Sequence, residues 1–207
     1  MLKNLLKLFS ISIFLVFFSC TPHRVESPAY TVINVEDLIS SKRNISSIET
    51  IFSITFENDG LKYKGDGFLT ISKNGDMTLR IYYLGFLRFE MTSMNNEVKS
   101  NPVIDRNKST ILTEGFRDCL FWWDMTDFEM TEQSDSYLLK NTFRKVWLDK
   151  GTKLPLKQTI TLMDGRELRI FYEKPERIKE VWYPSKIRIE FIQYVVTLDI
   201  EEILFFL

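Results

Sequence analysis

The chain has 207 residues, enough for one domain with its own hydrophobic core and too few for two domains of ordinary size. Its 27 lysine and arginine side chains nearly balance 28 aspartate and glutamate side chains, which argues against nucleic acid as a partner, because nucleic acid demands a clustered basic face. The 17 phenylalanines are numerous enough to fill a solid core or to line a cavity.

The first twenty residues have the pattern of a secretion signal. Lys3 and Lys7 precede an apolar run over residues 8–18, which is too short to cross a membrane as a helix. Ser19 and Cys20 follow, and this succession resembles the lipobox of bacterial lipoproteins, although Phe17 stands where leucine is usual. The resemblance implies a lipoprotein signal peptide over residues 1–19 and lipidation of Cys20. The alternative is an ordinary signal peptide that is cleaved elsewhere.

The chain that starts at Cys20 has lost Lys3 and Lys7, so 25 basic side chains remain against 28 acidic ones, a net charge of −3. The modified cysteine of bacterial lipoproteins carries two or three acyl chains, and two or more chains hold a protein firmly on a membrane. Residues 20–31 lack periodicity, and we interpret them as a lipidated N-terminus and tether. Thr21 is not the aspartate that often retains lipoproteins at the inner membrane, so we expect the anchor on the periplasmic face of the outer membrane.

Apolar residues at positions 35, 38, 39 and 45 predict a short helix over residues 35–46. Beyond it, apolar and polar residues alternate, which is typical of antiparallel strands with one buried face. Asn58-Asp59-Gly60, Asn74-Gly75-Asp76 and Asp164-Gly165 supply turns. The alternating segments are residues 52–56, 77–83, 87–91, 158–162, 168–172, 187–191 and 196–200.

Residues 112–123 interrupt this alternation, because their apolar residues fall at helical spacing, although Gly115 weakens the pattern. We therefore predict a mainly β (α+β) domain over residues 32–207. It consists of an antiparallel sheet of about ten strands, curled into an unclosed barrel, with short helices that form a lid over its mouth.

The order of these elements resembles the LolA/LolB-like superfamily of periplasmic and outer-membrane lipoprotein carriers and receptors. The likeness rests on a helix that leads directly into the strand at residues 48–56, on the glycine-bearing segment 64–71, and on an apolar Leu-Gly hairpin within residues 79–90. Segment 155–165 and Tyr183-Pro184 are similar to the closing hairpins. The resemblance implies an apolar cavity that accepts acyl chains of lipids or lipoproteins, and a role in receiving or inserting lipoproteins at the outer membrane.

The residues expected to line this cavity follow from strand parity, because successive side chains of a strand point to opposite faces. If no cavity exists, the same side chains fill a solid core. The candidate set is Phe52, Ile54, Phe56, Leu69, Ile71, Leu79, Ile81, Phe89 and Met91.

Residues 82–87 join two predicted strands without the Asn, Asp or Ser that turns normally contain. Only Gly85 suits a turn. The resemblance implies that Leu84 and Phe86 form a membrane loop that enters the bilayer beside the Cys20 anchor. The alternative is that this tip folds against another part of the domain.

Reactive groups are scarce. His23 is the only histidine and lies in the expected tether, which argues against His-dependent catalysis and against a His-ligated zinc site. Cys119 has no disulfide partner if Cys20 is lipidated, and we interpret it as a buried inert thiol rather than a reactive one beside Arg117. We expect a monomeric non-enzyme without catalytic residues, metal or cofactor. The alternative function is a structural or envelope-sensing lipoprotein that binds a protein partner with the same fold.

Overall fold

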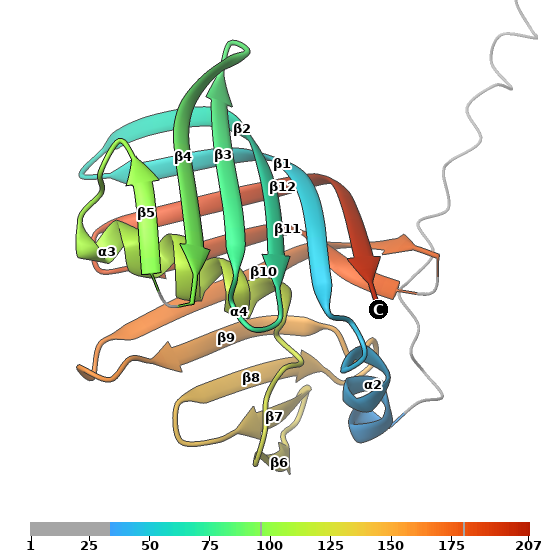
Figure 1. Cartoon of the computed structure of the whole chain (residues 1–207). Coiled ribbons are helices and arrows are strands. Elements are labelled where there is room, and N and C mark those ends of the chain that lie inside the picture. Colours follow the sequence, from blue (N-terminus) through green and yellow to red (C-terminus); the bar gives the residue numbers. More distant parts are fainter. Residues whose placement is uncertain (1–33, 96, 180) are drawn as a thin grey trace, which may run out of the picture.

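The computed structural model describes residues 34–95, 97–179 and 181–207 (Figure 1). The predicted signal peptide over residues 1–19, the lipidation site Cys20 and the tether over residues 20–31 lie outside the described residues. Every helix and strand reported below therefore belongs to the domain predicted over residues 32–207.

The described residues form a single antiparallel sheet of 12 strands with two helical regions against it. The strand order is β5-β4-β3-β2-β1-β12-β11-β10-β9-β8-β7-β6, and the edge strands β5 and β6 do not pair with each other, so the sheet is an unclosed barrel. The strands are β1 (Ser47–Asn58), β2 (Leu61–Ser72), β3 (Met77–Tyr83), β4 (Phe86–Met94), β5 (Glu97–Asn101), β6 (Glu129–Glu132), β7 (Ser136–Lys140), β8 (Arg144–Asp149), β9 (Pro155–Thr161), β10 (Glu167–Ile178), β11 (Val181–Phe191) and β12 (Tyr194–Phe206).

The mainly β class and the unclosed sheet are confirmed, but the predicted number of about ten strands is too low. The alternating segments did not include β5, β6, β7 or β8. β5 and β6 are short edge strands, and almost all of their side chains are exposed on both faces. A strand without a buried face has no reason to alternate apolar and polar residues, so its sequence carries no period-two signal.

Both predicted helices are present, with different ends. α2 (Val35–Lys42) starts after Asn34, whose side chain accepts a hydrogen bond from the backbone N–H of Asp37 at 2.7 Å. The second helical region begins at Arg106 rather than at residue 112 and ends at Leu120 rather than at residue 123. It consists of α3 (Arg106–Thr110), a π-helical segment (Ile111–Gly115) and α4 (Phe116–Leu120).

The early start of this helix has a local cause. Asp105 accepts a hydrogen bond from the backbone N–H of Lys108 at 3.0 Å and so caps the first turn. No residue of α3 is buried, which is why no apolar period marks it in the sequence. The π-helical segment brings Gly115 against β10 and β11, where a Cβ atom would lie 3.4 Å from side-chain atoms of Leu168 and Ile189.

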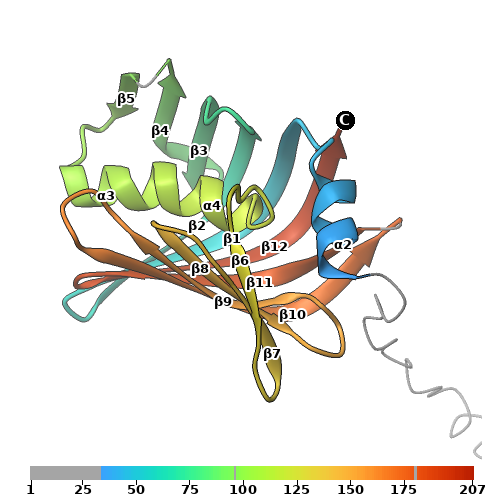
Figure 2. The same cartoon turned by 90° about the horizontal axis from the view of Figure 1, so that it is seen from below.

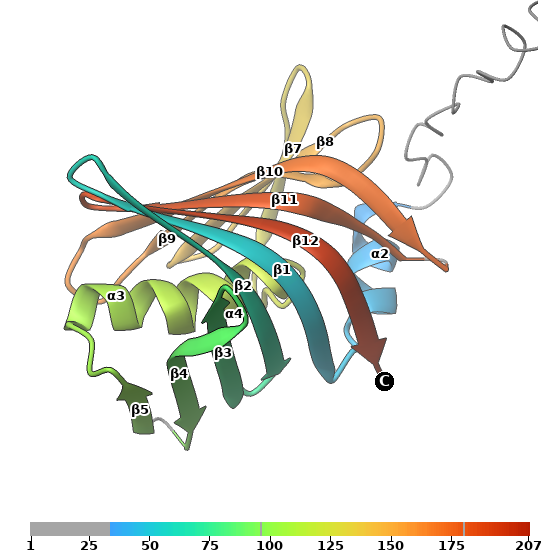
Figure 3. The same cartoon turned by 90° about the horizontal axis from the view of Figure 1, so that it is seen from above.

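The sheet curves around the α3–α4 helix, which lies along its concave face, while α2 crosses one end (Figures 2 and 3). Register places the apolar side chains of neighbouring strands on that face: Phe52 pairs with Gly67 and Ile200, and Leu69 pairs with Leu79. Glycine fits at position 67 because the Phe52 ring covers this position and leaves no room for a Cβ atom. The concave face and the helix together enclose the hydrophobic core.

A β-bulge keeps the apolar side chains of β12 directed toward the concave face along the whole strand. The β1–β12 register shifts between Ile51 and Phe52, which pair with Glu202 and Ile200, so that Glu201 is the extra residue. The shift reverses the parity of β12 and directs Ile203 to the core side, where it is 2% exposed. Without it, the strand would turn Glu202 toward the core.

Candidate functional site

The concave face is hollow at one end. A pocket of about 310 Å³ lies between α3 and strands β1 to β4, at the lower limit of volumes typical for small-molecule sites. We call this part of the concave face the open end. Its apolar wall consists of Ile54, Phe56, Ile81, Phe89, Ile104 and Leu112.

The pocket exists because α3 sends no buried side chain toward the sheet. Leu112 is the first apolar helix residue that lines the pocket, one turn after Lys108. The sheet nevertheless continues its apolar alternation beneath α3. Apolar sheet surface without an apolar helix surface opposite it leaves space between the two layers.

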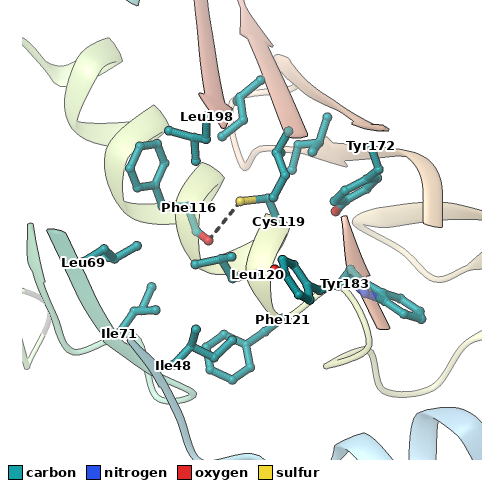
Figure 4. Close-up of a cluster of buried hydrophobic side chains, with 14 of the residues drawn as sticks. Ile48, Leu69, Ile71, Phe116, Cys119, Leu120, Phe121, Tyr172, Tyr183 and Leu198 are labelled. Carbon is teal, nitrogen blue, oxygen red and sulfur yellow. Dashed lines mark hydrogen bonds between the residues drawn. The ribbon is translucent and has the colours of Figure 1, made fainter. Parts of the chain in front are cut away.

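The other end of the concave face is solid. We call it the closed end; it lies under α4 and under the segment Phe121–Trp123 that follows it. Phe116 packs edge-to-face on Phe52 with 6.1 Å between ring centres, and the rings of Trp122 and Trp123 lie 5.6 Å apart. Figure 4 shows Phe116, Leu120 and Phe121 between the sheet residues Ile48, Leu69, Ile71 and Leu198.

A buried cation holds the turn that follows α4. Arg144 on β8 donates hydrogen bonds to the carbonyl oxygens of Asp124 at 2.9 Å and Trp122 at 3.4 Å, and its guanidinium lies 3.5 Å from the Asp118 carboxylate. These contacts pair two carbonyl groups of the turn that would otherwise be buried without a donor. The two tryptophans are therefore fixed in the core although they lie beyond the helix.

A second buried cation docks α2 on the closed end. Lys42 donates a hydrogen bond from Nζ to the carbonyl oxygen of Trp182 at 3.3 Å, and Nζ lies 4.8 Å from the centre of the Trp123 ring. Burial lowers the pKa of Lys42 to about 7, because removal from water disfavours the charged form.

The nine predicted cavity residues divide between the two ends. Ile54, Phe56, Ile81 and Phe89 line the pocket. The other five are buried in the core: Phe52, Leu69, Ile71, Leu79 and Met91. All nine follow the parity of the concave face.

Sequence reasoning did not identify Ile104, Leu112, Asn58 or Lys108 as pocket residues. Ile104 lies between β5 and α3, in a segment without periodicity. Leu112 was recognised as apolar at helical spacing, but that spacing does not say which end of the helix faces a void. Asn58 and Lys108 are polar, and a search for apolar parity passes over them.

Polar groups gather at one corner of the pocket. Asn58 pairs with Tyr194 in the β1–β12 ladder, and the side-chain Oδ1 of Asn58 is buried without a hydrogen-bond partner among the described residues. Lys108 Nζ lies 5.8 Å from the centre of the Tyr194 ring and 3.1 Å from a carboxylate oxygen of the exposed Asp105. The ring of Tyr194 also contacts Phe56, with 5.5 Å between centres.

The β3–β4 hairpin carries an apolar tip at the open end, and Figure 1 shows it projecting beyond the neighbouring hairpins. Leu84 and Gly85 both have positive φ angles, +51° and +78°, which a type I′ turn requires and which leucine rarely adopts. Leu84 is 77% exposed and Phe86 69% exposed. The tip therefore does not fold against the rest of the domain.

Other reactive groups are placed as follows. Cys119 is buried, and its Sγ donates to the carbonyl oxygen of Phe116 at 3.3 Å (Figure 4). Burial raises the pKa of the Cys119 thiol. Within residues 34–95, 97–179 and 181–207, no three His, Cys, Asp or Glu side chains are grouped to hold a metal ion. None of the helices in this part of the chain has the length and apolar character needed to cross a membrane.

Comparison with known proteins identifies the fold. No protein-family model and no curated protein sequence matches the chain. Solved structures do match the chain. A DUF1329 family protein from Desulfovibrio piger has a TM-score of 0.54 at 13% identity, and the match covers 83% of this chain and 90% of that chain. A LolA superfamily protein from Nitrosomonas europaea has a TM-score of 0.52 at 14% identity, covering 83% of this chain and 93% of that chain. The resemblance to the LolA/LolB-like superfamily is thus confirmed at the level of the fold, and this chain has a LolA-like fold.

Proposed function

We propose that this chain is a lipid-anchored protein of the cell envelope that binds acyl chains of lipids or lipoproteins in the pocket of the open end. The observation that carries the proposal is the position of the pocket at the base of the apolar tip. Ile81 and Phe89 face each other across the β3–β4 ladder in the pocket wall, and the turn at Leu84 follows three residues after Ile81. An acyl chain has about 10 Å to travel from the wall to the tip.

The exposed tip supports contact with a bilayer. Tyr83 and Leu87 flank Leu84 and Phe86, and both are about half exposed. Large apolar side chains gathered at a hairpin tip form a patch that water disfavours. Burial of Leu84 and Phe86 in lipid would contribute roughly 3–6 kcal/mol, enough to orient a protein that is already tethered.

The anchor in this proposal is lipid on Cys20, with the tether over residues 20–31, on the periplasmic face of the outer membrane. The lipobox-like sequence at residues 17–20 supports it. Cys20→Ser should leave the protein uncleaved or soluble, without palmitate labelling. Membrane fractionation and labelling that persist in this variant would refute the anchor.

The binding function is tested on residues 21–207, which lack the acylated cysteine and contain every described helix and strand. Native mass spectrometry of the purified protein should show bound lipid. A protein that carries no lipid, and takes none up from vesicles, would refute acyl-chain binding and leave the structural or envelope-sensing alternative.

The tip is tested by Leu84→Glu combined with Phe86→Glu, which should abolish binding of residues 21–207 to liposomes and leave thermal unfolding unchanged. The matched control is Phe143→Glu combined with Met163→Glu, which replaces two other exposed apolar residues at distant turns and should leave liposome binding intact. Unfolding of the tip variant would show that the tip belongs to the core.

A further inference from the structure

The ligand of this pocket can be specified from the polar corner. We propose that the pocket takes an amphiphile whose head carries both a negative charge and a hydrogen-bond donor, as the glycerol phosphate head of a lysophospholipid does. This inference rests on the proposed acyl-chain binding and adds the chemistry of the head.

The residues that line the pocket indicate that the ligand head is negatively charged. Its lining includes two lysines, Lys64 and Lys108, and no acidic residue of the described chain. Gly65 pairs with Ile54 and so takes the concave face of β2, which gives its neighbour Lys64 the parity of the convex face. Lys108 comes from α3, and its ammonium lies beside the Tyr194 ring within the polar corner. An anionic head at this corner would receive a charge-assisted hydrogen bond from Lys108 Nζ.

Asp105 competes with a ligand anion for the ammonium group of Lys108. Its exposed carboxylate already pairs with Lys108 at 3.1 Å, and such exposed pairs are weak in water. A ligand anion therefore competes with Asp105 for the same ammonium. Removal of the carboxylate should strengthen binding of an anion, and asparagine would still cap the helix through its side-chain oxygen.

Asn58 indicates that the ligand head carries a hydrogen-bond donor. Its Oδ1 is buried in the polar corner and receives no hydrogen bond from the described residues. A buried acceptor without a donor is unfavourable, and a carboxylate or a fully ionised phosphate has no donor to offer it. A hydroxyl on the ligand head, next to the charged group, would supply one. Asn58 is the ladder partner of Tyr194, Lys108 Nζ lies 5.8 Å from the centre of the Tyr194 ring, and both residues line the same pocket, so we place one head group against both.

The test compares three ligands with residues 21–207 by titration calorimetry. At about pH 8.5, where phosphate monoesters are dianions, lauroyl lysophosphatidate offers charge and hydroxyl, dodecyl phosphate offers charge alone, and dodecanol offers a hydroxyl alone. Lysophosphatidate should bind tightest, dodecyl phosphate next, and dodecanol about tenfold or more weaker than dodecyl phosphate. Dodecanoate in place of dodecyl phosphate separates a fatty-acid head from a phosphate head, and tighter binding of either anion than of dodecanol supports the charge contact with Lys108, whereas the donor contact requires that lysophosphatidate bind tighter than both anions.

Variants assign the contacts. Lys108→Met keeps the aliphatic stem and should bring the two anions close to dodecanol in affinity, whereas Asp105→Asn should raise the affinity for both anions about two- to threefold. Asn58→Leu should remove only the advantage of lysophosphatidate over dodecyl phosphate. Lys99→Met, on the exposed edge strand β5, is the control and should change nothing.

Equal affinity for dodecyl phosphate and dodecanol in the unaltered chain, or an advantage for anions that survives in Lys108→Met, would overturn the inference while acyl-chain binding stands. An advantage of lysophosphatidate that survives in Asn58→Leu would overturn the role of Asn58. Failure of all the ligands to bind would instead refute the proposed function itself.

Discussion

The open end and the closed end use one continuous sheet face, with the same apolar alternation, and yet one is hollow and the other solid. At the closed end, α4 places Phe116 and Leu120 on the sheet, and Trp122 and Trp123 fill the remaining space. At the open end, α3 contributes no buried residue. The comparison shows that the helix, rather than the sheet, decides where the pocket lies.

The largest expected effect is on stability, which a large-to-small substitution should lower more at the closed end than at the open end. Phe116→Ala at the closed end should lower the free energy of unfolding by about 3–5 kcal/mol, because it removes a fully buried ring and leaves a cavity. Phe89→Ala in the pocket wall should cost only about 1–2 kcal/mol, because this ring is already partly exposed. Urea denaturation of both variants measures the difference. Equal losses would mean that the open end is packed as tightly as the closed end.

The next prediction uses the buried lysine of the closed end. Since the pKa of Lys42 is lowered to about 7, the folded chain releases this proton at a pH where the unfolded chain still holds it. The free energy of unfolding should therefore rise from about pH 7 to about pH 10, by an amount on the order of a few kcal/mol.

Lys42→Met should flatten that rise, which denaturation at several pH values would show. Lys99→Met is the control, because its side chain is exposed on β5 and its removal should leave the rise in place. A rise of the same size in Lys42→Met would mean that other groups cause it and that Lys42 keeps its proton when folded.

The smallest expected effect concerns the apolar tip of the open end. Asparagine tolerates the positive φ of residue 84 better than leucine does, so Leu84→Asn should raise the free energy of unfolding by about 0.5–1 kcal/mol. The same change should weaken liposome binding of residues 21–207. Thermal unfolding and vesicle sedimentation measure the two effects. Loss of stability, or unchanged vesicle binding, would contradict the view that leucine is kept at this turn for contact with lipid.

The parity of the strands could be predicted well. Ile54, Phe56, Ile81 and Phe89 were assigned to one face by alternation alone, and register places them there. Alternation suffices because the side-chain period of a strand is two, so a single buried face determines the direction of every second residue. The edge strands β5 and β6 were missed because neither of their faces is buried.

The polar corner of the pocket could not be predicted. Asn58 lies at the end of a strand, Lys108 in the first helical turn and Tyr194 at the start of β12. Nothing in their spacing along the chain indicates that they meet. The β1–β12 pairing, which joins segments more than a hundred residues apart, brings Asn58 beside Tyr194, and the position of α3 over the sheet brings Lys108 to the Tyr194 ring.

The sequence by itself determined the mainly β class, the apolar face of the sheet and the apolar hairpin tip at Leu84 and Phe86, because these depend on residues that are close along the chain. The tertiary structure alone decided that Leu69 and Met91 lie in solid core while Phe56 and Phe89 line a pocket. Strand parity gives all four the same direction. What they contact depends on which part of the helix lies above them, and that is set by packing between elements distant in the sequence.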